Sequence, residues 1–230
     1  MKFGILCAMD EEIKSLLDNL DNTKKVDIKE MTFYEGNISG QEVVLVRSGI
    51  GKVEAGLTTA QLITSFDVDI VINSGSAGGI GQGLAVGDVV VSTETAYHDV
   101  DARAAGYEYG QLPGQPARFK ASEKWVKEIT EASKEVGLNV QKGLIVTGDQ
   151  FVADQAVIDN ILKNFPDALS CEMEGAAVGQ VANQFDIPYV VVRAMSDNAN
   201  GDADRSFDEF IIDAGKKSAQ MLLDLFANQK

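Results

Sequence analysis

Short apolar runs alternate with amphipathic stretches along almost the whole chain. The runs have the length and the Val/Ile content of β-strands, and they read KFGILCAM, VVLVRSG, DIVINSGSAGG, DVVVSTETAYHD, GLIVTGDQF, LSCEME and YVVVRAMSD. The stretches between them predict helices that start at Asp10 and Lys52, span 122–136 and 156–163, follow LSCEME, and start again at Ser206. Because near-continuous apolar strands suit a sheet covered on both faces, the pattern predicts an α/β fold, a single-domain three-layer α/β/α sandwich with a central mixed, largely parallel sheet.

Polar residues gather where the predicted strands end. These ends fall at residues 8–12, 48–51, 75–79, 147–149, 172–174 and 193–197. Folds of this class bind ligands at the carboxyl ends of their strands, so we expect a functional site there. The chain has no repeat, low-complexity tract or linker, which predicts one domain over residues 1–230. Residues 101–118 form the longest segment without clear periodicity, as is typical of functional or interfacial loops.

Charge and composition exclude several classes of function. Lys and Arg together number 20 and Asp and Glu 35, which gives a formal net charge of −15. Such a chain repels phosphate backbones and anionic lipid surfaces, so neither nucleic acid nor membrane is an expected partner. No apolar run approaches the ~20 residues of a membrane span, and the N-terminus lacks a secretory signal, which predicts a cytoplasmic protein. The single histidine, His98, and two distant cysteines offer no metal site.

Three glycine- or acid-rich segments resemble ligand-binding motifs but do not satisfy them. GSAGGIGQG contains no G-x-G-x-x-G window, and SGIGKV lacks both the first glycine and the final Ser/Thr of a phosphate-binding loop. SDNANGDADRSF has Ser at the first position of a calcium loop and Phe207 where the bidentate Glu belongs. The sequence therefore predicts no dinucleotide, ATP or calcium site.

Three acids lie at three different strand ends, at Glu12, Glu174 and Asp197. Cleavage of an N-glycoside needs an acid at the leaving base, a carboxylate that activates water, and negative charge near the ribose. On spacing alone, however, Glu12 and Glu174 equally suit the first turns of helices, and Asp197 suits a helix cap or a loop. On spacing alone, the structural interpretation is therefore favoured over the catalytic one.

Nine sequence blocks occur in one order across nearly the whole chain: KFGILCAMDEE, SGIGKVEA, NSGSAGG, VGDVVVS, YHDVDARAAGYEYGQLPG, GDQF, CEMEGAAV, VVRAMSDNA and SFDEF. Together they resemble the bacterial 5′-methylthioadenosine/S-adenosylhomocysteine nucleosidases. The resemblance implies a nucleoside phosphorylase-like fold. It also implies hydrolysis of 5′-methylthioadenosine, S-adenosylhomocysteine and 5′-deoxyadenosine, with water and the nucleoside as the only reactants and no cofactor or metal.

The resemblance also implies roles for the three acids. Glu12 is expected to activate the hydrolytic water with help from Ser76 and Arg193, and Asp197 to protonate adenine at N7. Glu174 is expected to bind the ribose hydroxyls. The remaining substrate contacts that the resemblance implies are Met173 beneath the sugar, Phe151 stacked on adenine, Val152 at the base edge, Met9, Ile50 and Phe207 around the ribose and the 5′-thioalkyl group, and Gly78.

The resemblance further implies a homodimer. In the family, the loop equivalent to residues 102–113 reaches the neighbouring active site, where Tyr107 and Pro113 would complete the pocket. Ala105 stands where family members commonly carry an aromatic residue, and Ala102 where a larger aliphatic is usual. Both changes should widen the subsite for the 5′ group.

Two alternatives to a nucleosidase are a phosphorylase of the same fold and a non-catalytic nucleoside-binding protein. A phosphorylase needs Arg or Lys beside Gly-rich backbone amides, whereas the loop after the first strand offers Asp10, Glu11 and Glu12. A binding protein would have little reason to keep an acid, a base and a ribose carboxylate together. The sequence therefore favours the hydrolase.

Overall fold

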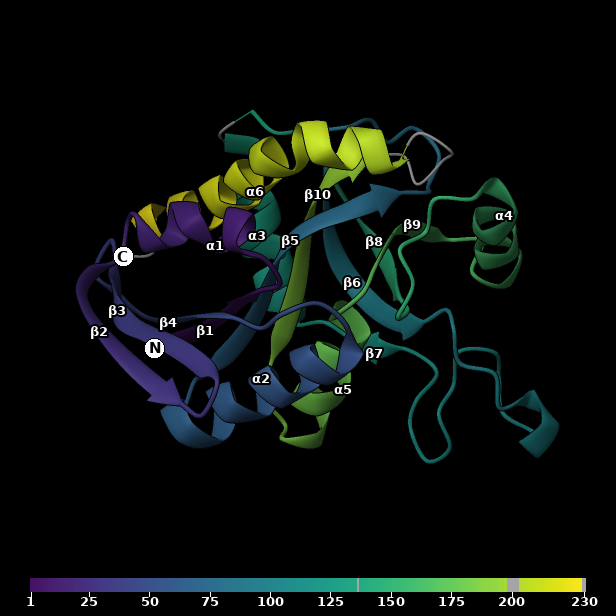
Figure 1. Cartoon of the computed structure of the whole chain (residues 1–230), viewed down its shortest axis with the longest axis horizontal. Coiled ribbons are helices and arrows are strands. Elements are labelled where there is room, and N and C mark those ends of the chain that lie inside the picture. The colour runs from purple at the N-terminus through teal and green to yellow at the C-terminus, as the bar shows by residue number, and fades with distance from the viewer. Residues whose placement is uncertain (136, 198–202, 229–230) are drawn as a thin grey trace.

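The computed structural model describes residues 1–135, 137–197 and 203–228, with side chains in the last range described from residue 210 onward. Its strands form one mixed sheet (Figure 1). Their order is β10 (Tyr189–Asp197), β6 (Val89–Tyr97), β8 (Val140–Thr147), β9 (Ala168–Glu172), β5 (Ile70–Gly79), β1 (Lys2–Cys7), β4 (Gln41–Arg47), β3 (Met31–Ile38) and β2 (Asp21–Ile28). The short β7 (Phe119–Lys120) pairs with β6.

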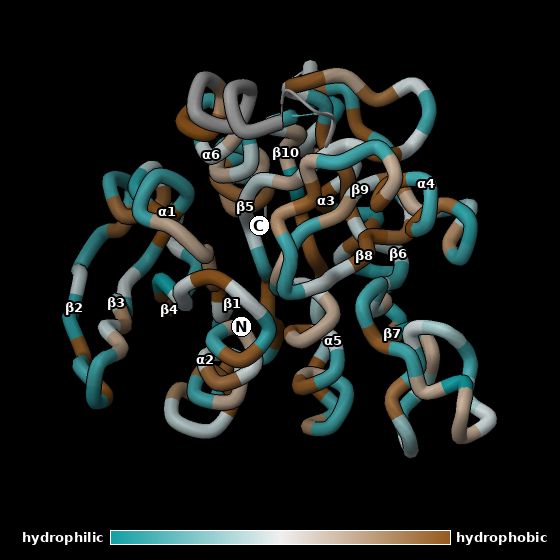
Figure 2. The backbone as a smooth tube through the Cα atoms, turned by 45° about the vertical axis from the view of Figure 1, so that its right-hand side comes forward, coloured by the Kyte–Doolittle hydropathy of each residue, from teal (hydrophilic) through white to brown (hydrophobic). Residues whose placement is uncertain are grey.

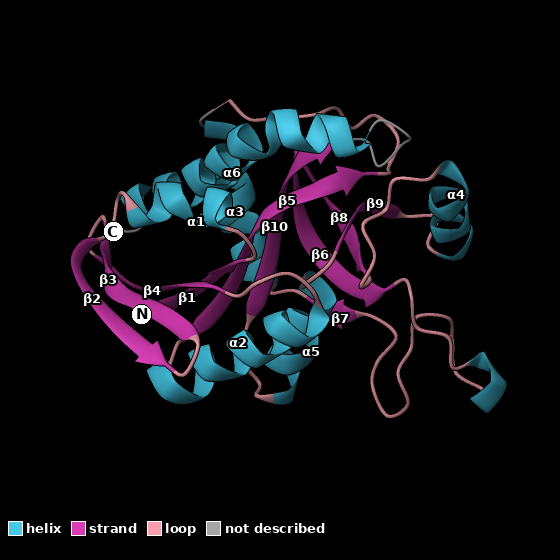
Figure 3. Cartoon of the chain, viewed as in Figure 1, coloured by secondary structure: helices cyan, strands magenta, loops and turns pink. Residues whose placement is uncertain are grey.

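Helices cover both faces of this sheet, as the apolar strands predict (Figure 3). One layer contains α1 (Asp10–Leu17), α3 (Glu123–Glu135) and α6 (Ala203–Asn228), and the other contains α2 (Lys52–Phe66) and α5 (Gly175–Gln184). Helix α4 (Gln155–Asn164) lies apart from both layers. Its Ile158 and Ile161, with Phe165 that follows it, pack into a smaller apolar cluster. The expected fold class, a three-layer α/β/α sandwich around a mixed sheet, is confirmed.

The long strand β5 organises the sheet. It runs parallel to β1 on one side and to β10 on the other, and at Gly78 and Gly79 it also pairs antiparallel with β9. Because β10 pairs in turn with β6, and β6, β8 and β9 are neighbours, the strands β5, β10, β6, β8 and β9 close into a ring. The carboxyl end of β9 therefore approaches those of β1, β5 and β10 from the opposite direction.

The sequence pattern misses the hairpin of β2 and β3, which pair antiparallel next to β4. Most side chains of β2 are exposed, and the tube of Figure 2 is largely hydrophilic there, so no apolar run marks the strand. Lysines along such an edge strand discourage pairing with a second molecule. The unpatterned segment 101–118 is mostly loop in the structure and includes the 3₁₀ turn η1 (Arg103–Ala105), which projects from the body of the molecule (Figure 1).

Local chemistry explains where the helices near the strand ends begin. Asp10, Glu11 and Glu12 occupy the first turn of α1, where carboxylates interact favourably with the helix dipole. Helix α2 follows Gly51, whose φ of 100° is a conformation that favours glycine. None of the helices in the described residues is long and apolar enough to cross a membrane.

An aromatic cluster joins the sheet to the α3/α6 layer. Phe3 is 1% exposed, and its ring contacts Trp125 at a centroid distance of 5.1 Å and Phe226 at 4.9 Å, both edge to face. We expect Phe3→Ala to lower the free energy of unfolding by about 3 to 5 kcal/mol, because it leaves a cavity and removes both ring contacts. Urea denaturation measures this loss. The control Phe185→Ala, at a ring that is 44% exposed, should cost far less, and equal losses would contradict the packing described.

Candidate active site

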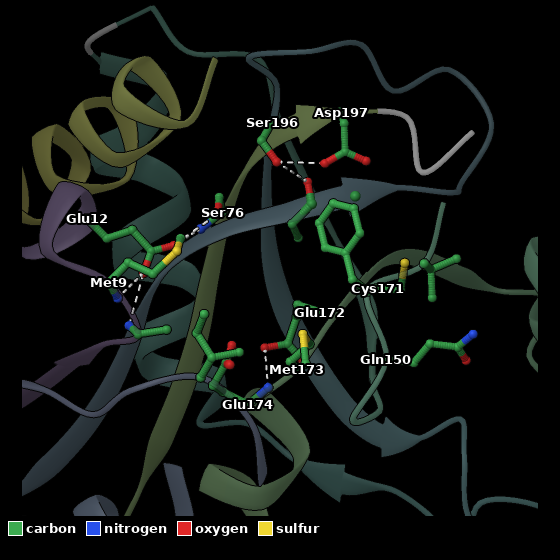
Figure 4. A pocket seen from close by; sticks show the side chains of 16 residues that line it. Met9, Glu12, Ser76, Gln150, Cys171, Glu172, Met173, Glu174, Ser196 and Asp197 are labelled. Atoms are coloured by element: carbon green, nitrogen blue, oxygen red, sulfur yellow. Dashed lines mark hydrogen bonds between the residues drawn. The ribbon is translucent and has the colours of Figure 1, made fainter. Parts of the chain in front are cut away.

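One pocket opens where β1, β5, β9 and β10 end (Figure 4). Its walls come from the β1–α1 junction, the β4–α2 loop, the end of β5, the segment after β8, the β9–α5 junction and the end of β10. Of the residues singled out in the sequence, those that line it are Met9, Glu12, Ile50, Ser76, Gly78, Phe151, Val152, Met173, Glu174 and Asp197. The fold thus gathers side chains from positions more than 180 residues apart.

Glu12 is buried, and donors surround its carboxylate. Oε2 accepts the backbone N–H groups of Ala8 (2.9 Å) and Met9 (3.1 Å), while Oε1 accepts both the N–H and the hydroxyl of Ser76 (2.9 Å each). The side chain therefore reaches from α1 to β5. Gly75 makes this approach possible, because a Cβ there would lie only 2.7 Å from Glu12 Oε1 and 2.9 Å from an Arg193 nitrogen.

Asp197 lies at the end of β10, on another wall of the pocket, and is 2% exposed. The hydroxyl of the neighbouring Ser196 donates to Asp197 Oδ2 at 2.8 Å (Figure 4). A buried carboxyl group held in this way points into a confined space where it can exchange a proton with a bound ligand.

Glu174 forms part of a buried charged group at the β9–α5 junction. Its Oε1 accepts the N–H of Gly51 at 2.8 Å, and its Oε2 lies 3.4 Å from Arg193 Nη2. The same Arg193 nitrogen donates to Glu172 and, at 2.6 Å, to Asn73. Burial and the Glu172 carboxylate raise the pKa of Glu174 from 4.5 to about 8, although Arg193 acts in the opposite direction.

Apolar groups form much of the remaining pocket wall. Met9 and Met173 carry flexible thioethers, and Phe151 and Ile50 are 45% and 55% exposed at the rim. Large apolar side chains that face an open pocket suit a flat ring or an alkyl group of a ligand. Among the described residues, the structure contains no group of three or more His, Cys, Asp or Glu side chains arranged to hold a metal ion.

Three residues singled out in the sequence lie elsewhere, and a fourth has a side chain that the structure does not describe. Arg193 is 1% exposed and lies behind the pocket wall, where its hydrogen bonds go to Asn73, Glu172 and Glu174. Tyr107 and Pro113 belong to the projecting loop and do not line this pocket. Phe207 falls within α6, but its side chain is outside the part of the chain that the structure describes.

Known proteins resemble this chain over its whole length. The family model of the phosphorylase superfamily matches residues 2–227. A 5′-methylthioadenosine/S-adenosylhomocysteine nucleosidase of Shewanella pealeana is 45% identical over 226 residues, which cover 98% of both chains. This chain belongs to that nucleosidase family.

Solved structures agree with this membership. The S-adenosylhomocysteine nucleosidase of Streptococcus pyogenes, in complex with 5-methylthiotubericidin, matches with a TM-score of 0.97 at 46% identity and covers 100% of this chain and 98% of its own. The corresponding nucleosidase of S. pneumoniae, with the transition-state inhibitor MT-ImmA, gives a TM-score of 0.95 at 48% identity and 99% coverage of both chains. This chain therefore shares its fold with both solved nucleosidases over nearly its whole length.

Sequence reasoning missed several lining residues of the nucleosidase pocket. They are Ala8, Ala77, Gln150, Cys171, Glu172 and Ser196. All of them except Cys171 are direct neighbours of a residue that was singled out, and Cys171 lies two positions before Met173, so a search that included flanking positions would have found them. Burial raises the pKa of the Cys171 thiol, which makes that side chain a small apolar part of the wall. Glu172, in contrast, adds a fourth acid.

The raised pKa of Glu174 predicts a pH dependence of stability. Because the folded state binds this proton more tightly than the unfolded state, its contribution to stability is full below about pH 4.5 and is lost as the pH rises to about 8. Relative to Glu174→Gln, the wild-type free energy of unfolding should therefore fall across this window, by at most about 1.4 kcal/mol per pH unit. Urea denaturation from pH 5 to 8 at fixed protein concentration measures the difference. The exposed control Glu123→Gln should run parallel to wild type, and a Glu174→Gln curve that did the same would contradict the assignment.

Proposed function

We propose that this protein hydrolyses the N-glycosidic bond of 5′-methylthioadenosine and S-adenosylhomocysteine, and that of 5′-deoxyadenosine, releasing adenine and the 5′-substituted ribose. Such a reaction belongs to methionine salvage and to the removal of methyl-cycle by-products. The observation that carries the proposal is the placement of Glu12, Glu174 and Asp197, which come from three different elements, around one pocket. Membership of the nucleosidase family supports the same reaction.

Asp197 acts on the base in this proposal. Its carboxyl group donates a proton to N7 of adenine, which turns the base into a better leaving group. The same group accepts a hydrogen bond from the exocyclic amine, whereas a 6-oxopurine would present an oxygen acceptor there and be disfavoured. Phe151 stacks on the ring, and the backbone of Val152 contacts its edge.

Glu12 and Glu174 act on water and on the sugar. Glu12 orients and activates the water that attacks the anomeric carbon as the glycosidic bond breaks. Glu174 binds the ribose hydroxyls, and its charge stabilises the oxocarbenium-like transition state. Met173 packs beneath the ribose, while Met9 and Ile50 surround the sugar and the 5′ group.

The surroundings of Glu12 favour hydrolysis over phosphorolysis. A phosphate ion binds to backbone N–H groups and cationic side chains. The N–H groups of Ala8, Met9 and Ser76 already donate to the Glu12 carboxylate, which occupies the place that an anion would take. The described residues that line the pocket include neither Lys nor Arg. Water is therefore the nucleophile that this pocket accommodates.

Substitution of the acid and the base tests the proposal. We expect Asp197→Asn and Glu12→Gln each to lower kcat for 5′-methylthioadenosine by about 10²- to 10⁴-fold, because positioned acid–base groups contribute in this range. Adenine release in phosphate-free buffer with a chelator present measures the loss. The matched controls Asp213→Asn and Glu123→Gln change exposed acids and should retain wild-type rates.

Three outcomes would contradict this function. Adenine release that required added phosphate would indicate a phosphorylase, and turnover lost to the chelator would indicate a metal enzyme. Tight nucleoside binding without any base release would indicate a binding protein. A substrate panel with 5′-deoxyadenosine, adenosine and inosine in the same assay ranks the substrates, and inosine should be the poorest.

The proposal includes a cytoplasmic homodimer. Ile50 at the pocket rim is 55% exposed, and Val53 and Leu57 on the adjoining helix α2 are 77% and 49% exposed, so large apolar side chains are exposed from the rim onto α2. Lys52, between Ile50 and Val53, binds Asp99 at 2.7 Å, so this surface adjoins the start of the projecting loop. In the dimer, loop 102–113 of each protomer brings Tyr107 and Pro113 to its partner's pocket, and the small Ala102 and Ala105 leave room for the 5′ group.

A complementation experiment tests the shared site. Tyr107→Ala should raise KM about tenfold while the protein remains dimeric, because one aromatic contact is lost. When Tyr107→Ala and Asp197→Asn chains are co-expressed in equal amounts, half of the dimers are mixed, and each mixed dimer has one intact pocket. About a quarter of all sites should therefore regain wild-type kinetics. Rates at sub-saturating substrate measure this recovery, and light scattering measures the dimer. A mixture that behaved as the average of its two parent proteins would contradict the exchange of loops.

A further inference from the structure

The first turn of α5 has an unusual cap. Glu174 is its N-cap residue, but its side chain makes no capping hydrogen bond. Glu172 takes this role: Oε2 accepts the N–H groups of Glu174 (3.1 Å) and Gly175 (2.8 Å). The hydroxyl of Thr147 accepts the next N–H, that of Ala176, at 2.8 Å. The free donors of the helix terminus are thus satisfied from β8 and β9, and the Glu174 carboxylate is left for the pocket.

Within the described residues, every hydrogen-bond partner of the Glu172 carboxylate is a donor. Besides the two helix N–H groups, it accepts hydrogen bonds from Thr147 Oγ1 and from Arg193 Nη2. Because Thr147 Oγ1 already accepts the N–H of Ala176, its own hydrogen points to Glu172. An amide in place of this carboxylate would turn an N–H₂ group toward other donors. The site is therefore built for a carboxylate at this position.

Glycine at position 175 permits this cap. A Cβ there would lie 3.2 and 3.3 Å from the two carboxylate oxygens of Glu172 and 3.1 Å from a methyl carbon of Val191. Glu172 itself is only 7% exposed although it borders the pocket, so its position is fixed by packing on all sides. Figure 4 shows it beside Met173 and Glu174 at the same junction.

We propose that Glu172 is the positioning residue for Glu174: it caps α5 in place of Glu174 and holds Arg193, so that the Glu174 carboxylate faces the ribose. This inference rests on the proposed function. The charged groups around Glu174 are Glu172 on β9, Arg193 on β10 and Glu12 on α1, and the N–H of Gly51 also faces it. Loss of the Glu172 charge would therefore change both the orientation and the ionisation of Glu174.

Glu172→Gln tests the inference by its effect on sugar recognition. We expect kcat/KM for 5′-methylthioadenosine to fall about 10²-fold, with a smaller loss for its 2′-deoxy analogue, because the ribose hydroxyl contact is what is impaired. The ratio of the two kcat/KM values in Glu172→Gln should move toward the ratio in Glu174→Ala. The double variant Glu172→Gln/Glu174→Ala should lose far less kcat/KM than the product of the two separate losses, because both changes impair the same contact. Glu123→Gln should leave the ratio at the wild-type value.

The pH profile gives a second readout. In wild type, the acidic limb of the kcat/KM profile follows ionisation of Glu174 in the free enzyme. Because the Glu172 charge raises the pKa of Glu174, this limb should move to lower pH in Glu172→Gln. Thr147→Val, which removes one partner of Glu172, should give a smaller change in the same direction, and Thr147→Ser should restore wild-type behaviour. This pair also keeps the test decisive when Glu172→Gln fails to fold.

The outcomes separate the two proposals. A wild-type protein that releases no adenine would overturn the proposed function itself. An active wild type, together with folded Glu172 and Thr147 variants whose substrate ratio and pH limb stay unaltered, would overturn the positioning role alone. Equal losses on both substrates would do the same, since they would indicate a general structural defect.

Discussion

Arg193 is a buried cation among buried acids, and the geometry of the pocket depends on it. Its guanidinium, 1% exposed, connects Asn73 on β5 with Glu172 at the end of β9 and Glu174 at the start of α5. Burial by itself would lower the pKa of Arg193, but the nearby carboxylates raise it above its ordinary value. Without this charge, Glu172 and Glu174 would lie together unpaired in a medium of low dielectric, which is costly. The cation therefore allows a protein with a net charge of −15 to gather further acids in its interior.

The acids of the pocket are held in different ways, which suits the different tasks proposed for them. Glu12 accepts four hydrogen bonds from the β1–α1 junction and Ser76, so it is fixed in position. Glu174 accepts one N–H and lies near a cation, and its pKa is raised to about 8. Neighbouring carboxylates whose surroundings differ in this way can serve separate steps of one reaction. Glu172 differs again, because its hydrogen bonds serve the helix terminus and Arg193.

The closed arrangement of strands explains how these side chains meet. Strands β1, β5 and β10 run in one direction and β8 and β9 in the other, so their carboxyl ends would lie at opposite edges of a flat sheet. The pairing of β5 with both β10 and β9 brings Asp197 opposite Gly78, and Gly78 opposite Cys171, one residue before Glu172. The pocket is therefore formed where two sets of strand ends face each other.

The sequence by itself determined most of the strands and helices and led to a prediction of the chemistry. The apolar runs predicted β1, β4, β5, β6, β8, β9 and β10, and the amphipathic stretches predicted the helices between them, because burial imposes these patterns locally. The resemblance to nucleosidases singled out Glu12, Glu174 and Asp197, which spacing alone left ambiguous.

Tertiary structure decided the features that depend on contacts between residues distant in the sequence. The edge hairpin of β2 and β3 carries too little apolar pattern to be detected, and the ring of strands depends on pairings between β5, β9 and β10. The capping role of Glu172 requires Thr147 and Arg193, which reach it only in the folded chain, because hydrogen bonds between distant residues leave no periodic signal in the sequence.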